Sequence, residues 1–312
     1  MPDVDLSLTE LLPKKRLQSH LTPRRPVTKI VVLAACASSV YSQSLHLLIP
    51  NAQIVTFHAN RARRERDKLA KAIRDARVLV VEDTLTDLLP RDCGGCRTIK
   101  FPLFAFAGYH PDFLFVQSKS AGLVSSPISN YHSLIAFTAY KEGKSAKDAL
   151  GLYRQEVYTK LMYHSVWTMS RNELLWRFSE LGFDIQPLFR RWANEGCFMY
   201  NFNHPHEKCI LDISRLIAKR ITNHARDIQF PLDDGSARGG VLPCYPGIAE
   251  RFGTSGDYYF KVPKVPKVLN LREYVVGSFN EYRKHGRDDM PVPHSHRVRY
   301  EVIANLLHGR EE

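Results

Sequence analysis

The stretch that decides the fold runs from Lys29 to Gln43 and reads Lys-Ile-Val-Val-Leu-Ala-Ala-Cys-Ala-Ser-Ser-Val-Tyr-Ser-Gln. Its first part, Ile30 to Leu33, is an unbroken aliphatic run, which is typical of a strand buried on both faces. Small residues surround Cys36, and either Ser38 or Ser39 can then cap a helix. Such a turn leaves backbone N–H groups that suit an anion or a developing oxyanion. We expect Cys36 at its tip; the alternative is that Cys36 is a small buried apolar residue.

The same alternation continues through the following residues. Three more apolar runs predict strands and one segment of helical spacing predicts a helix; the strands lie at 53–57, 78–81 and 98–101 and the helix at 61–76. This order is typical of an α/β fold, here a short parallel sheet of three or four strands with right-handed crossovers. Ligands of such sheets bind beyond the carboxyl ends of the strands. We therefore expect the turns that hold Cys36, His58 and Glu82 to share one edge.

The chain is expected to have three parts. Residues 1–26 form a basic arm in which prolines alternate with lysines and arginines. Residues 27–125 form the small α/β subdomain with the Cys36 turn. Residues 126–312 are mainly helical and pack on that subdomain.

Helix signals support the assignment of the last part. Ser145 with Asp148, and Ser170 with Glu173, have the spacing of capping boxes, and Gly182 is a suitable helix end. Three further helices are predicted at 207–220, 271–284 and 297–307.

Composition limits the class of protein. Of 312 residues, 44% are hydrophobic and 24% are charged, which describes a soluble globular chain without a transmembrane segment. The first 25 residues lack the apolar region of a secretory signal, and six cysteines without such a signal indicate reduced thiols and a cytoplasmic protein. A net charge of +12 favours an anionic partner, which could be a nucleotide cofactor, a nucleic acid or a membrane headgroup.

Two His-Pro turns carry candidate catalytic groups. In Phe101 to Asp112, aromatic residues alternate with small ones before His110, so Phe104 and Tyr109 could line an apolar pocket. In the second turn, Pro205 restrains His204, and Asn201 and Asn203 offer amide donors. An imidazole with an ordinary pKa of about 6.5 suits proton removal from a hydroxyl. The alternative for His110 is a buried loop in which the ring is only hydrogen-bonded. The alternative for His204 is a metal site with His206, for which two histidines without a third ligand are weak evidence.

Other motifs give weaker signals. Cys93 and Cys96 form a CxxC, but no second pair has the spacing of a zinc site, so we interpret the motif as a glycine-rich turn and expect no metal. The chain contains no Walker A, GxGxxG or GxSxG sequence.

At these stretches the chain resembles the WcbI-type family of polysaccharide biosynthesis proteins. The resemblance covers most of the chain after Val27. It rests on three segments in order: Val-Leu-Ala-Ala-Cys-Ala-Ser at 32–38, Phe-Pro-(x)6-Tyr-His-Pro-Asp at 101–112, and Asn-His-Pro at 203–205. Many relatives carry Gly-Asn-Cys-Gln at the first turn, whereas this chain keeps only the cysteine, within Ala34-Ala35-Cys36-Ala37.

The resemblance implies a coenzyme A-binding acetyltransferase of capsule assembly that O-acetylates a sugar, a deoxyheptose, from acetyl-CoA. The acceptor would be a sugar, a nucleotide sugar or a polysaccharide, and no nucleic-acid motif accompanies the charge. The expected catalytic residues are Cys36, His204, His110 and Asn203. The expected cofactor-binding residues are Ser38, Ser39, Gln43, Lys14, Lys15, Arg61, Phe104 and Tyr109.

Three hypotheses of function remain at this point. The first is direct acyl transfer with His204, or else His110, as the base and with the N–H groups near Cys36 as the oxyanion site; a covalent route through Cys36 is its variant. The second is an SGNH-like esterase, although such enzymes use serine. The third is a non-enzymatic polyanion-binding module that uses the cationic face of residues 61–71 and the N-terminal arm.

Overall fold

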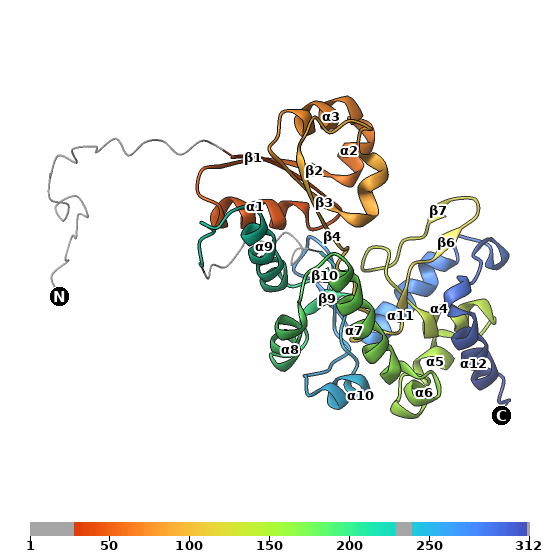
Figure 1. Ribbon diagram of the computed structural model, residues 1–312. Coiled ribbons are helices and arrows are strands. Elements are labelled where there is room, and N and C mark those ends of the chain that lie inside the picture. The colour runs from red at the N-terminus through yellow and green to blue at the C-terminus, as the bar shows by residue number, and fades with distance from the viewer. Residues whose placement is uncertain (1–27, 229–238, 311–312) are drawn as a thin grey trace, which may run out of the picture.

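A parallel four-stranded sheet forms the first half of the fold. The computed structural model describes residues 28–228 and 239–310. The sheet has the order β2-β1-β3-β4, and each neighbouring pair is parallel (Figure 1). Its strands are β1 (Thr28–Ala34), β2 (Ala52–His58), β3 (Val78–Glu82) and β4 (Arg97–Phe101). The predicted fold class and all four predicted strands are confirmed.

The two faces of the sheet are buried against different helices. Ile30, Val32 and Ala34 face a core that includes α1 (Ser38–Leu48) and α9 (Glu207–Ile221). Val31 and Leu33 face a second core with α2 (Ala59–Arg64), α3 (Arg66–Arg74) and the 3-10 helix η1 (Asp83–Leu88). Side chains alternate along a strand, so the aliphatic run of β1 supplies both cores. This burial explains why the run carries no polar residue.

The rest of the chain is mainly helical, as predicted (Figure 1). Its remaining helices are α4 (Leu134–Lys141), α5 (Ala146–Leu150), α6 (Gln155–Lys160), α7 (Tyr163–Glu180), α8 (Gln186–Asn194), α10 (Pro246–Ala249), α11 (Leu271–Tyr282) and α12 (Arg297–Leu307). Short strand pairs join them: β5 (Phe113–Leu114) with β8 (His132–Ser133), β6 (Gln117–Ser118) with β7 (Gly122–Leu123), β9 (Met199–Asn201) with β10 (His204–Pro205), and β11 (Phe260–Lys261) with β12 (Val268–Leu269).

The helical part is packed on the sheet. α9 packs against α1 at a steep angle (Figure 1), and one buried cluster continues from β1 through α1 and α9 into α4, α7 and α11. A salt bridge of 3.1 Å between Arg177 of α7 and Asp83, directly after β3, also connects the helical part to the sheet. The division at residues 125 and 126 stays a prediction. Within the described residues, no helix is long and apolar enough to cross a membrane.

Three helix predictions need correction. The predicted helix 61–76 is interrupted at Glu65, whose ψ of 48° is not helical, although neither glycine nor proline marks the site. Ala37, not Ser38 or Ser39, precedes α1, and no side chain caps it in the described part of the chain. Ser170 lies inside α7, because that helix begins seven residues earlier at Tyr163.

Candidate functional site

The carboxyl ends of three strands meet at one edge of the sheet. Ala34 at the end of β1 pairs with His58 at the end of β2, and Leu33 pairs with Val81, one residue before Glu82. Cys36 follows β1 in the turn that leads to α1. The predicted shared edge of Cys36, His58 and Glu82 is therefore confirmed.

The carboxylate of Glu82 holds the Cys36 turn in place. Glu82 is only 3% exposed. The Ala35 N–H donates to its Oε2 at 3.2 Å, and the Thr84 hydroxyl donates to its Oε1 at 2.7 Å. Both carboxylate oxygens thus have a partner, and one of them fixes the backbone directly before Cys36.

Cys36 is exposed at this turn, so the alternative prediction of a small buried apolar residue is wrong. Burial of the sulfur by the surrounding chain nevertheless raises the pKa of the thiol, and the negative charge of Glu82 raises it further. A hydrogen bond from the Cys36 backbone acts in the opposite direction. The thiol form is therefore the stable form near neutral pH, and the thiol is a poor nucleophile.

The start of α1 lies directly after the cysteine. It has no acidic residue in its first turn, and among the described residues no side chain caps it. The first N–H groups of a helix have no partner within the helix and carry a partial positive charge. The Ser39 and Val40 amides are thus suitable donors to an oxyanion beside Cys36.

His204 belongs to the β9–β10 hairpin. Its Nδ1 lies 2.9 Å from Asn201 Oδ1, 3.0 Å from Asn203 Oδ1 and 3.1 Å from the Tyr131 hydroxyl. Amide oxygens only accept hydrogen bonds, so this arrangement favours a proton on Nδ1. In the neutral ring, Nε2 then carries the basic lone pair. This is the tautomer that a general base requires at Nε2.

Tyr131 connects the hairpin to the cysteine turn. Its hydroxyl donates to Asn203 Oδ1 at 3.0 Å and lies beside His204 Nδ1. Burial raises the pKa of Tyr131, and the charge of an ionised Cys36 raises it further. Cys36 and Tyr131 are therefore within electrostatic reach of each other, so the structure brings Cys36, Asn203 and His204 into one region.

His110 lies elsewhere, in the core. It is 1% exposed, and its Nε2 is 3.1 Å from the Leu242 carbonyl oxygen. Burial lowers its pKa to about 4, so the ring is neutral. Phe104 and Tyr109 are also buried, at 4% and 1% exposure, and pack against other aromatic rings. These three side chains act in packing, and the function proposed below does not use them.

The remaining predicted ligand-binding residues are at different places. Ser38 is buried and Ser39 is exposed at the start of α1, and Gln43 is exposed one turn later. Arg61 binds locally: it donates to the Thr56 carbonyl oxygen at 3.2 Å and to Glu65 at 3.1 Å. Lys14 and Lys15 lie outside the described residues. A role of these residues toward a ligand stays a prediction.

The CxxC segment forms a turn, because Gly94 and Gly95 have φ angles of +62° and +76°. Cys93 and Cys96 are free thiols. Within residues 28–228 and 239–310, no three His, Cys, Asp or Glu side chains are grouped as metal ligands.

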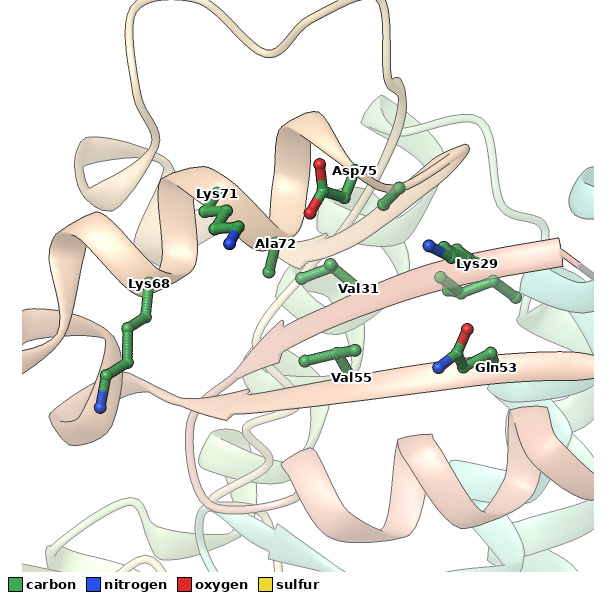
Figure 2. A pocket seen from close by; sticks show the side chains of 10 residues that line it. Lys29, Val31, Gln53, Val55, Lys68, Lys71, Ala72 and Asp75 are labelled. Atoms are coloured by element: carbon green, nitrogen blue, oxygen red, sulfur yellow. The ribbon is translucent and has the colours of Figure 1, made fainter.

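A separate groove lies at the other end of the strands. Figure 2 shows Val31, Val55 and Ala72 at its floor and Lys68 and Lys71 on α3. Its volume is about 280 Å³. It lies beside the first residues of β1 and β2, away from the carboxyl edge that holds Cys36.

One residue of the site, Tyr131, gave no signal in the sequence. Tyr131 lies 73 residues before His204, so no local pattern connects them. Asn201 is 3% exposed and orients His204, while its own amide donates to the Gly240 carbonyl oxygen at 3.3 Å. The contact of Tyr131 with this turn could be found only from the structure.

The sequence profile of a family described as "Polysaccharide biosynthesis enzyme WcbI" matches residues 29–225, which is more than half of the chain and contains Cys36, Tyr131 and His204. The chain belongs to the WcbI family. It is therefore a polysaccharide biosynthesis enzyme, and the resemblance inferred from its motifs is confirmed. A comparison with curated protein sequences gives no match.

A solved structure of WcbI itself has the same fold. It is 15% identical to this chain, with a TM-score of 0.64 over 92% of this chain and 96% of the other. That structure is described as a native protein without a disulfide bond between CoA and a cysteine. At this identity the likeness shows the fold of the present chain and nothing more.

Proposed function

We propose that this WcbI-family enzyme transfers an acetyl group from acetyl-CoA to a hydroxyl of a sugar, a deoxyheptose, during capsular polysaccharide synthesis in the cytoplasm. The observation that carries the proposal is the polar cluster around His204. It favours the tautomer with a basic Nε2 in the same region as Cys36 and the uncapped start of α1. The mention of CoA in the solved WcbI structure supports the choice of acyl donor.

The reaction proceeds in two steps. His204 Nε2 takes the proton of the sugar hydroxyl while the hydroxyl oxygen attacks the thioester carbonyl carbon. The tetrahedral oxyanion accepts hydrogen bonds from the first amides of α1. The Asn203 side-chain oxygen accepts a hydrogen bond from the Tyr131 hydroxyl, so the NH₂ group of Asn203 can also donate to the oxyanion. The intermediate then expels the CoA thiolate, which receives the proton from His204.

Direct transfer fits the electrostatics of Cys36 better than a covalent route. An acyl-enzyme requires a thiolate, whereas burial and Glu82 raise the pKa of the Cys36 thiol. The same argument disfavours an esterase that would use Cys36 in place of the SGNH serine. In this proposal Cys36 lies against the thioester and does not attack it.

Several residues fit the donor substrate. The exposed thiol of Cys36 and the exposed side chains of Ser39 and Gln43 line the α1 side of the site. Arg61 and the N-terminal lysines Lys14 and Lys15 are the cations proposed for the phosphates. Because Arg61 already binds Glu65, its contribution should be small.

The test is the His204→Gln variant. Loss of the base should lower transfer of isotope-labelled acetyl from acetyl-CoA to a panel of monosaccharides that includes deoxyheptoses by about 10²–10⁴-fold. CoA affinity, measured by calorimetry, should stay within about 3-fold, because the base contacts the acceptor.

The matched control is His206→Gln, two residues away on the same turn. His206 packs on the Tyr200 ring, with centroids 4.3 Å apart, and has no role in the mechanism. The His206→Gln variant should retain most of the acetyl-transfer activity. Full activity of His204→Gln would remove His204 from the mechanism, and absence of CoA binding by the wild type would reject the transferase.

A further inference from the structure

Three aromatic rings form a cluster beside the site. The Phe115 ring centroid lies 5.5 Å from that of Tyr131 and 5.0 Å from that of Phe202, and Tyr131 and Phe202 are 5.4 Å apart. Tyr131 is 7% exposed and Phe202 is partly buried, whereas Phe115 is 38% exposed. Each ring comes from a different segment, so the cluster is a product of the tertiary fold.

The exposure of Phe115 is imposed by its neighbours in the chain. Leu114 is 2% exposed and Val116 is fully buried, so the backbone on both sides is fixed and only the Phe115 side chain emerges. Phe202 is fixed as well, because the Phe106 N–H donates to its carbonyl oxygen at 2.8 Å. An exposed phenyl ring gives up part of its hydrophobic stabilisation, and a rigidly held one is well suited to bind a ligand.

The cluster lies on the side of the proposed general base. The ring of Tyr131 packs against both phenylalanines, while its hydroxyl lies 3.1 Å from His204 Nδ1. Because His204 must reach the acceptor hydroxyl, a surface in contact with His204 is close to the place where the acceptor would bind.

The chemistry of the surface also fits a sugar. A pyranose ring has one face of C–H groups with partial positive charge, and an aromatic face is electron-rich. Around that face the hydroxyls need polar partners, and Asn203 lies directly beyond Phe202 in the chain. A deoxy sugar has more C–H surface and would gain most from such a wall.

We propose that Phe115 and Phe202 form an aromatic wall that binds the C–H face of the acceptor sugar next to His204. This inference rests on the proposed acetyl transfer and names the subsite that selects the acceptor.

The first test is kinetic and uses the full chain. Phe115→Ala should raise the acceptor KM by about 10-fold, which corresponds to one stacked ring, and leave kcat and CoA affinity within about 2-fold. Phe115→Trp, which restores an aromatic face, should recover the acceptor KM. The matched control is Trp176→Ala on α7, which removes an aromatic ring that is 60% exposed but lies outside the cluster, and should change nothing.

The second test needs no turnover. Saturation-transfer NMR with the methyl glycosides of fucose and rhamnose should show contact with sugar C–H protons in the wild type and in Trp176→Ala, but not in Phe115→Ala. A sugar signal in a protein that fails to bind CoA would support the wall and reject only the transferase. Sugar contacts unchanged by Phe115→Ala, or weakened CoA affinity with an unchanged acceptor KM, would overturn the wall.

Discussion

Cys36 is exposed, yet its pKa is raised by burial of the sulfur and by the charge of Glu82. Iodoacetamide reacts with the thiolate, so its rate at Cys36 should still rise with pH above 9 and show no plateau near pH 8. Glu82→Gln removes the negative charge and keeps an acceptor for the Ala35 N–H. This variant should react several-fold faster at pH 8, because each unit by which the pKa falls gives about tenfold more thiolate.

Mass spectrometry of the cysteine peptides measures this rate, and Cys93 in the same sample is the internal control. Cys93 lies in the glycine-rich turn beyond η1 and should react equally fast in both proteins. A slower or unchanged rate at Cys36 in Glu82→Gln would show that Glu82 does not set its ionisation.

Single residues of the site were predictable to different degrees. Cys36 and His204 stand beside local signals, a strand end and a proline, so their position followed from neighbouring residues. Tyr131 acts through a contact across the fold, and a tyrosine has no local signature for such a role, whereas Asn201 lies only three residues before His204. His110 carried the same His-Pro signal as His204 but is buried, because a local motif does not reveal what packs over it.

Two serines test the helix signals at the scale of elements. Ser145 precedes α5, and its side chain accepts from the Asp148 N–H while Asp148 accepts from the Ser145 N–H. Ser145→Ala should therefore lower the free energy of unfolding by about 1 kcal/mol. Ser170 has the same sequence signal but lies inside α7, where alanine is the better helix former.

Urea unfolding of both variants measures the difference. Ser170→Ala should leave the free energy of unfolding unchanged or raise it by a few tenths of a kcal/mol. Equal losses in the two variants would mean that α7 begins at Ser170 and not at Tyr163.

The capping pattern was therefore neither necessary nor sufficient to locate helices, because α1 and α7 begin without a side-chain cap among the described residues. Gly182 shows the more reliable signal: its φ of +73° ends α7 as predicted, since few other residues adopt that angle. The break at Glu65 had no such residue.

At the scale of the whole molecule, the parallel sheet was predictable because β1 is uniformly apolar and such strands need helices on both faces. The arrangement of the helical part was not predictable, because its elements meet through non-local contacts. Those contacts bury titratable groups: His110 and His132 are at most 1% exposed and Asp112 is fully buried. The burial of these groups leads to a prediction on acid stability.

Burial lowers the pKa of both His110 and His132 to about 4, so the folded chain resists protonation that the unfolded chain accepts near pH 6.5. Each imidazole therefore stabilises the fold at neutral pH, and about 3 kcal/mol of that is lost as the pH falls from 6.5 to 4. Burial raises the pKa of Asp112 to about 6, so the folded chain takes up this proton before the unfolded chain does. Protonation of Asp112 therefore raises the free energy of unfolding by about 3 kcal/mol as the pH falls from 6 to 4. For the wild type we therefore expect the free energy of unfolding, measured with urea, to fall by about 3 kcal/mol between pH 7.5 and 4.5.

Asp112→Asn removes the opposing group and should make that loss larger. A free energy of unfolding of the wild type that stayed constant or rose over this range would contradict the burial of the two histidines.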